Sequence, residues 1–433
     1  MNLKSRQLWK NALKPKNRAK LLDLVLNTVE NSEFIIAHKT APKYFTRDRI
    51  WNFKITFLFI CSMLNKRAQT EIDTFFSKLY GIPEEVRQTT ASSLTQCRAK
   101  ISFTAFAEVV EKMVGFFYGN YSFKKYYGYR LIAIDGSVYT LPRTEKTIAE
   151  FGENILSNNR KWIKAQVSFA ADVLNNICCA ATIGAYKQSE GIQSLELMNK
   201  LGSNNLYLFD RGYFGRLFLR DVVNTGCQFC FRLQRNACSE VIEFIKSNKK
   251  DIVNFIEVKG EPIKVRLTKV LLDTGEEEYL MTSLFDTNTF TVQKLKSLYH
   301  QRWGVEEQYK DMKYAICVEN FIGKTPNSIK QEFFANILTY NLSMMLCKSI
   351  IDRESNKKNK KRKYKTNKRA LLAKIKQCFV SLFFNVQDAC KTLCNIIKTV
   401  SKESVPIRDN RKYVRGKTAK AKIKPHRAYV SVV

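Results

Sequence analysis

The chain has 433 residues, with 73 lysines and arginines against 39 aspartates and glutamates, so its formal net charge is +34, while apolar residues make up 45% of it. This balance excludes a disordered chain and predicts two or three folded domains with a strongly cationic surface, whose natural partner is a polyanion. The longest apolar run near the start, Ile55 to Leu64, is too short to span a bilayer, and no secretory signal opens the chain, so neither membrane contact nor secretion is expected.

The twelve cysteines are spread along the whole chain, a distribution typical of reduced, buried thiols in a cytosolic protein. One C-x2-C pair, Cys227 and Cys230, falls in a predicted strand, where an offset of three residues sends the two side chains to opposite faces. None of the three histidines is near this pair. A zinc site is therefore not expected.

Residues 1 to about 120 are predicted to be helical, with helices from Arg47 to Asn65 and from Thr70 to Tyr80. The segment from Thr90 to Phe106 predicts two helices with a short turn between them. With its basic residues Arg98 and Lys100, this segment could be a DNA-reading unit. A plain helical bundle explains the same pattern equally well.

The next region alternates strands and helices. Apolar runs predict strands near 129–142, 164–173, 177–186, 205–213 and 227–234, and helices near 191–201 and 216–224. The ribonuclease-H-like fold has the same element order: three antiparallel strands, a helix, a parallel strand, a helix and a strand. The predicted fold class is therefore mixed α/β.

Two of these strands lead into an aspartate with the same local pattern. Asp135 follows Leu-Ile-Ala-Ile, and Asp210 follows Leu-Tyr-Leu-Phe. A carboxylate placed after such a run lies at the end of a buried strand, where open α/β sheets bind their ligands. One such aspartate would more often be a turn-capping residue, but two of them favour a shared site.

Between Gln234 and Thr291 the chain contains extra material, in which two runs, IKVRLTKVLL and EEEYLMTSLF, predict strands outside the core fold. The following stretch, Lys296 to Cys317, predicts one continuous helix.

Four residues of this predicted helix, Tyr299, Arg302, Glu306 and Lys313, lie within an arc of ~60° at about 100° per residue. A solvated face with a pair between Arg302 and Glu306 explains the charges. The alternative is a functional face that carries one catalytic carboxylate.

Beyond Lys330 the chain is again predicted to be helical, with an apolar stretch from Phe333 to Ile351. Two basic blocks follow, Asn356 to Arg369 and Arg408 to Arg427. Such blocks repel themselves and are expected to stay unfolded until a polyanion neutralises them, although a tail that only improves solubility is the alternative.

Three separated carboxylates, few histidines and a large positive charge suit two-metal phosphoryl transfer on DNA. Oxygen ligands from Asp135, Asp210 and Glu306 would favour two Mg²⁺ or Mn²⁺ ions over zinc.

The spacing Y-x2-R-x3-E-x6-K from Tyr299 to Lys313 resembles the YREK signature of the insertion-sequence-four family of DDE transposases. The sequences DGS at Asp135 and DRGY at Asp210 resemble the first two acidic motifs of that family. The likeness extends from about Pro42 to Arg427. It implies a ribonuclease-H-like catalytic domain with a β-rich insertion before the glutamate helix. It also implies that Asp135, Asp210 and Glu306 bind metal and catalyse, and that Tyr299, Arg302, Lys313 and Arg211 contact DNA.

The expected domains are a helical DNA-binding domain at 1–122, a catalytic domain at 123–326 with an insertion at about 236–290, and a helical, basic region at 327–433. The resemblance implies a prokaryotic, cytoplasmic and nucleoid-associated transposase that moves an insertion sequence by cut-and-paste. Its partners would be the terminal inverted repeats, target DNA and a second copy of the chain in a homodimer. The alternatives are a non-catalytic DNA-binding protein derived from a transposase and a nuclease on the same fold.

Overall fold

The computed structural model describes residues 16–47, 49–64, 66–155, 161–310, 321–348, 351, 364–384 and 386–406. The chain forms two compact units. Unit 1 comprises Met1–Tyr121, Thr140–Ile163 and Lys310–Val433, and unit 2 comprises Ser122–Tyr139 and Lys164–Tyr309. The predicted division into three consecutive domains stays a prediction.

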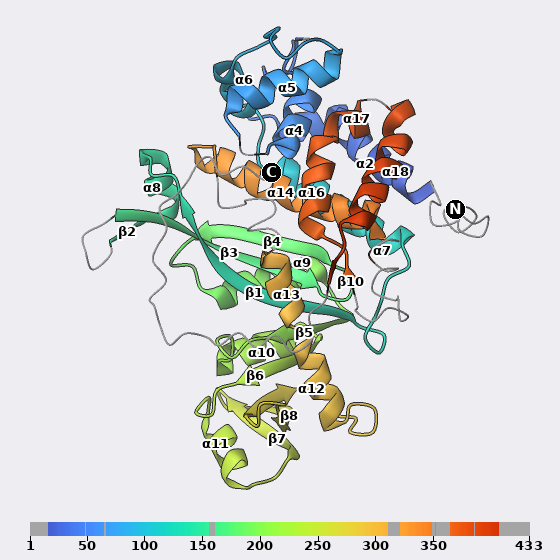
Figure 1. Cartoon of the computed structure of the whole chain (residues 1–433). Helices are drawn as coiled ribbons and strands as arrows, with labels where there is room; N and C mark the ends of the chain where they lie inside the picture. Colours follow the sequence, from blue (N-terminus) through green and yellow to red (C-terminus); the bar gives the residue numbers. More distant parts are fainter. Residues whose placement is uncertain are drawn as a thin grey trace, which may run out of the picture. The chain divides into compact units, whose positions relative to one another are not determined.

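The core sheet lies mostly in unit 2 and has the strand order β4-β3-β1-β5-β6 (Figure 1). β1 and β5 are parallel, as are β5 and β6, whereas β3 and β4 form an antiparallel hairpin. This is the strand order of a ribonuclease-H-like fold, so the predicted mixed α/β class is confirmed. The strands are β1 (Arg130–Leu141), β3 (Lys161–Asp172), β4 (Ile177–Ala185), β5 (Asn205–Phe209) and β6 (Gln228–Leu233).

The apolar runs of the central strands explain this arrangement. Leu131 to Ile134 in β1 and all of β5 are buried, as expected for strands covered on both faces. Parallel strands need a crossover, and helices α9 (Glu190–Leu201) and α10 (Arg216–Asn224) provide the two crossovers that flank β5. Each helix buries an apolar side, which includes Leu197 in α9 and Leu219 in α10.

The segment after β6 is β-rich, as predicted, and its strands lengthen the core sheet in place of forming a separate one. β9 (Glu277–Thr282) pairs antiparallel with β6, and the order continues to β8 (Glu261–Leu271) and β7 (Asp251–Val258). The short helix α11 (Ser239–Lys246) precedes β7. The sheet therefore extends from the predicted site into the insertion without a break.

Unit 1 is helical and is built on α14 (Pro326–Leu346), which contacts α4, α7 and α16. Residues 331 to 346 of α14 are all buried, and a helix that is covered on every side belongs to a core. Among the described helices, none combines the length and the apolar character that a membrane crossing requires. The remaining elements of unit 1 are α2 (Lys16–Glu30), α3 (Ser32–His38), α4 (Phe53–Ser62), α5 (Ala68–Tyr80), α6 (Ala91–Arg98), α7 (Thr104–Asn120), α8 (Glu145–Phe151), β2 (Glu153–Ile155), β10 (Tyr364–Lys365), α16 (Lys368–Gln377), α17 (Phe379–Phe383), α18 (Val386–Lys402) and β11 (Val405–Pro406).

Helix α4 is shorter than the helix predicted from Arg47 to Asn65. The side chain of Asn52 accepts a 2.8 Å hydrogen bond from the backbone N–H of Ile55, so the helix begins at Phe53. Before Asn52, the residues of the predicted helix that the structure describes, 47 and 49–51, are not helical. The two helices predicted between Thr90 and Phe106 are present as α6 and the start of α7.

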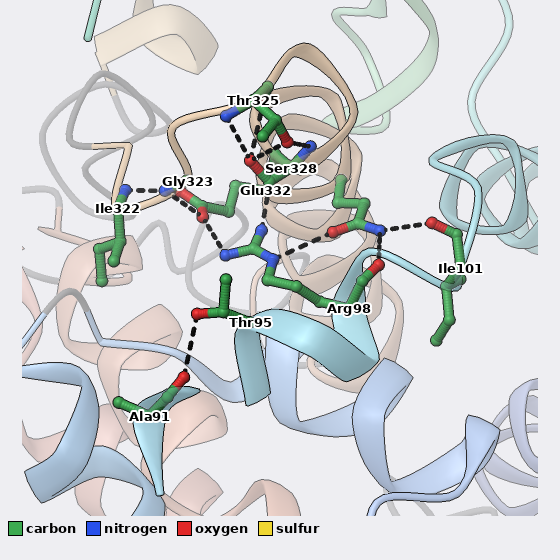
Figure 2. A network of polar contacts seen from close by, with 10 residues as sticks. Ala91, Thr95, Arg98, Ile101, Ile322, Gly323, Thr325, Ser328 and Glu332 are labelled. Atoms are coloured by element: carbon green, nitrogen blue, oxygen red, sulfur yellow. Dashed lines mark hydrogen bonds and ion pairs between the residues drawn. The ribbon is translucent and has the colours of Figure 1, made fainter. Parts of the chain in front are cut away.

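Arg98 is not available to read DNA, contrary to one of the two interpretations of this segment. Its side chain is buried, and Nη1 lies 2.8 Å from Oε1 of Glu332 on α14, while Nε and Nη2 donate to Gln331 and to the carbonyl of Ser328 (Figure 2). Glu332 in turn accepts hydrogen bonds from the backbone N–H groups of residues 322 and 323. Arg98 therefore ties α6 to the central helix of its own unit.

The first basic block is partly ordered, so the prediction that it stays unfolded is wrong for its last residues. Tyr364 and Lys365 form β10, which pairs with β11, and α16 begins at Lys368. The rest of this block and all of the second block lie outside the described residues.

Candidate active site

Asp135 lies in β1, just beyond Ala133, the last residue of that strand that pairs with β5. Its Oδ1 accepts a 3.1 Å hydrogen bond from the backbone N–H of Gly136. A Cβ at residue 136 would come within 2.9 Å of the side-chain ends of Gln166 and Glu190, so a larger residue there would displace these two side chains. Asp135 is therefore fixed at the carboxyl end of the central strands, where open sheets bind ligands.

Asp210 directly follows β5, at the same edge of the sheet. Its Oδ1 lies 3.3 Å from the hydroxyl of Tyr299, which donates to it, and 4.0 Å from Nη1 of Arg232. The structure thus brings together the two aspartates that the sequence pattern selected, each at the end of a paired strand segment.

The helix predicted from Lys296 to Cys317 is interrupted, so the prediction of one continuous helix is wrong. α12 (Val292–His300) and α13 (Trp303–Lys310) are separate helices, drawn in gold in Figure 1. Between them, the N–H groups of residues 301 and 302 bond to carbonyls three residues earlier, a tighter turn than that of an α-helix. Gly304 follows, and a Cβ there would lie 3.1 Å from that of Val173, so the chain passes close to another segment at the break. Lys313 lies outside the described residues.

Arg302 occupies this break and links two of the predicted catalytic carboxylates. Its Nη2 donates a 2.8 Å hydrogen bond to Oε1 of Glu306, and its Nη1 lies 3.9 Å from Oδ2 of Asp135. The predicted pair between Arg302 and Glu306 is therefore present. The solvated face, which was one of the two explanations of these charges, is not observed, because the Arg302 side chain is only 3% exposed.

Tyr299 is buried beside the same guanidinium, whose central carbon lies 5.9 Å from the centre of the tyrosine ring. Burial raises the pKa of the Tyr299 phenol far above its ordinary value, although the charge of Arg302 opposes that shift. The phenol is therefore a neutral hydrogen-bond donor toward Asp210 at physiological pH. Tyr299, Arg302 and Glu306 join the two aspartates in one network.

The pKa of Asp135 depends on its burial and on the charges of this network. This pKa is raised from 3.8 to about 6. Burial is the main cause, the guanidinium of Arg302 opposes the rise, and the negative charges of Glu306 and Asp210 add to it. The three carboxylates therefore interact electrostatically across the site. A positive charge among them stabilises their ionised forms.

Arg211 is exposed and lines a pocket of about 520 Å³ next to Asp210, together with Arg232 and Arg235. Sequence reasoning missed Arg232, which also bonds through Nη2 at 2.8 Å to Glu278. The alignment of the two predicted strands that became β5 and β6 would have indicated it. Phe209 is paired with Phe231, so the residue that follows each partner is Asp210 in one strand and Arg232 in the other.

Asp135, Asp210 and Glu306 provide only oxygen atoms, a donor set that suits a hard divalent cation. In the described part of the chain, no three acidic, histidine or cysteine side chains are grouped closely enough to enclose a metal ion. The guanidinium of Arg302 lies between two of the three carboxylates. The donors therefore fit Mg²⁺ or Mn²⁺ in kind, and Arg302 has to move aside for all three to share an ion.

Comparisons with known proteins support the resemblance found in the motifs. The family model described as "Transposase DDE domain" matches residues 126–342. The chain is 25% identical over 268 residues to the transposase InsG for insertion sequence element IS4 of Escherichia coli (strain K12), a match that covers 58% of this chain and 60% of that protein. The chain thus spans about 60% of the length of this relative. A cryo-EM structure of a piggyBac transposase synaptic complex with hairpin DNA is similar with a TM-score of 0.45 and 13% identity, covering 94% of this chain and 86% of that chain.

Proposed function

The chain belongs to the transposase DDE domain family, and on that premise we propose that it is a DNA transposase of the insertion-sequence-four type. The proposed reaction is cleavage of DNA strands at the ends of an insertion sequence, followed by their transfer into target DNA. The observation that supports it most is the network of Asp135, Asp210 and Glu306, which come from three separate parts of the chain and interact through Arg302 and Tyr299.

Asp135, Asp210 and Glu306 are the proposed metal ligands and catalytic residues. When bound, two Mg²⁺ or Mn²⁺ ions would activate water or a 3′-hydroxyl as the nucleophile and stabilise the oxygen that leaves. The raised pKa of Asp135 is consistent with this role, because an ionised carboxylate that burial and nearby negative charges destabilise gains most from a bound cation.

Arg302 and Tyr299 would position the DNA strand at this site. Displaced from Glu306 and Asp135, the guanidinium of Arg302 has a fork of donors that matches two oxygens of one phosphate. Tyr299 would keep Asp210 oriented through its hydroxyl. Lys313 and the exposed Arg211 are proposed as further phosphate contacts.

DNA is the proposed partner for two reasons. It is the substrate of the proposed reaction, and it is a polyanion that a chain with a net charge of +34 attracts. The terminal inverted repeats of the element and a target duplex would be its two substrates. A homodimer is proposed for the complex with DNA, since two element ends must be cut in one transposition.

The proposal is tested by incubating the purified full chain with Mg²⁺ and a DNA that carries both ends of the element, taken from the sequence that flanks its coding region. A transposase yields excised fragments and products joined to target DNA. A non-catalytic DNA-binding protein yields neither, and a nuclease on the same fold yields cut DNA without joined products.

A further inference from the structure

Unit 1 contains a group of positively charged side chains that includes no residue of the candidate active site. The loop from Lys43 to Trp51 and the turn after α6 enclose a pocket of about 370 Å³. This volume is at the lower end of the range of about 300–1,000 Å³ that small-ligand sites occupy, so the pocket has room for roughly one nucleotide. We call it the basic pocket. The lining side chains used in the argument are those of Lys43, Tyr44, Arg47, Arg49, Trp51 and Lys100.

The basic pocket is lined by four cations and, among its described residues, by no carboxylate. Many basic residues of unit 1, such as Lys54 and Arg143, form ion pairs with glutamates. No carboxylate in the described part of the chain pairs with any of the four cations of the pocket. Asp48 lies outside that part. The local excess of positive charge favours an anion.

Two of these cations share one aromatic ring. The Nζ atoms of Lys43 and Lys100 lie 5.9 and 5.5 Å from the centre of the Tyr44 ring, both within the range of a cation–π contact. Two ammonium groups held beside one ring repel each other, and a phosphate placed with them would remove that repulsion. The ring is also a surface on which a base or sugar can pack.

The loop that carries these side chains is held in place before any ligand binds. Phe45 has a φ of 56°, a left-handed conformation that is rare for a bulky residue, and its ring packs 5.4 Å from that of Phe53 in the core. The N–H of Thr40 donates a 2.9 Å hydrogen bond to the carbonyl of Lys100. Such pre-organisation lowers the entropic cost of binding.

We infer that the basic pocket binds one nucleotide of DNA, with its phosphate among Lys43, Arg47, Arg49 and Lys100 and its sugar or base against Tyr44. The inference rests on the proposed function for the choice of DNA as the anion. It places the DNA contact of unit 1 on the loop before α4 and on Lys100, and not on the buried Arg98. Phosphate contacts do not distinguish sequences, so the pocket adds affinity for all DNA.

The test compares two variants of the full chain that each have four positive charges fewer than the wild type. The pocket variant replaces Lys43, Arg47, Arg49 and Lys100 by glutamine. The control variant replaces four exposed basic residues of unit 1 outside the pocket by glutamine: Lys20, Arg67, Lys146 and Lys398. The measurements are the dissociation constant for a duplex and for a single-stranded oligonucleotide at several salt concentrations, and the melting temperature.

The pocket variant is expected to bind duplex DNA more weakly than the control variant. Its log–log salt slope should fall by about 0.9 for each phosphate group that the variant no longer neutralises. Equal affinities and equal slopes for the two variants overturn the inference.

Single substitutions at Tyr44 decide the role of the ring and guard against a misfolded quadruple variant. Tyr44→Phe keeps the ring and should bind DNA like the wild type, whereas Tyr44→Ala should bind single-stranded DNA about 10-fold more weakly at an unchanged melting temperature, since stacking of one base contributes ~1–3 kcal/mol. Unchanged binding by Tyr44→Ala contradicts a packed nucleotide.

Failure of this inference is distinguishable from failure of the proposed function. A protein that binds DNA through the pocket but never cuts it refutes the transposase activity alone. A protein that cuts DNA and is insensitive to the pocket substitutions refutes the pocket alone.

Discussion

Nη2 of Arg302 donates a 2.8 Å hydrogen bond to Oε1 of Glu306, and the arginine side chain is 3% exposed. Surface pairs with this i,i+4 spacing contribute little to stability. This pair differs because Arg302 is buried and also lies 3.9 Å from Asp135. Two of the three proposed metal ligands are thus linked by one guanidinium.

Replacing Arg302 by alanine should slow DNA cleavage by about 100-fold, because misplacement of a reacting group by about 1 Å can cost that much in rate. Affinity for DNA should stay nearly unchanged, since it is spread over many basic residues. Arg302→Lys should recover only part of the rate, because an ammonium cannot bind two phosphate oxygens as a guanidinium does. Cleavage rate and melting temperature are measured on the same proteins, and a normal rate for Arg302→Ala would refute the positioning role.

The pKa of Asp135 predicts how stability depends on pH in the absence of divalent cations. The pKa in the folded state is about 6, above the ordinary value of 3.8, so between these values the folded protein binds more protons than the unfolded chain. Raising the pH from 4 to 7 therefore lowers the free energy of unfolding. The loss should be up to about 3 kcal/mol, since each pKa unit corresponds to about 1.4 kcal/mol.

The Asp135→Asn variant lacks this titration and is the reference. It should match the wild type near pH 4 and be more stable than the wild type at pH 7.5 in denaturant unfolding with a chelator present. A difference between the two proteins that is the same at both pH values would contradict the shifted pKa.

The buried pair between Arg98 and Glu332 should be essential for the stability of unit 1. Arg98→Met leaves the Glu332 carboxylate buried without its cation and should cost about 3–5 kcal/mol. The double variant Arg98→Met, Glu332→Gln removes both charges and should regain part of that loss. Lys100→Gln, which changes a half-buried lysine close by, is the control and should stay within about 0.5 kcal/mol of the wild type. Equal melting temperatures for Arg98→Met and Lys100→Gln would contradict a structural role for Arg98.

Arg232 should contribute to the reaction although no sequence motif indicated it. Its Nη1 lies 4.0 Å from Oδ1 of Asp210, so Arg232→Gln is expected to lower the cleavage rate by about 10-fold, which corresponds to about 1.4 kcal/mol. Arg235→Gln is the matched control, because its side chain is 69% exposed and pairs with Glu277 at 3.4 Å. If both variants cut DNA equally well, Arg232 has no part in the site.

The sheet could be predicted because its strands are apolar runs of the right length. A buried strand such as β5 is a continuous apolar run in the sequence, and an aspartate that follows such a run is recognisable without any contact information. The break between α12 and α13 was not predictable from periodicity. At this break Gly304 lies close to Val173, which is distant in sequence, and such an approach leaves no periodic pattern. Arg98 shows the same limit, because its partners on α14 lie more than 200 residues away.

The cleavage rate of Glu306→Gln tests the central claim most directly. Glu306→Gln keeps the shape of the side chain and removes the charge of a proposed metal ligand, and Glu196→Gln, which changes an exposed glutamate paired with Lys200, is the control. DNA cleavage with Mg²⁺ and DNA binding are measured on both variants. We expect Glu306→Gln to bind DNA like the wild type and to show no detectable cleavage, while Glu196→Gln cuts normally. Normal cleavage by Glu306→Gln would contradict the assignment of the site.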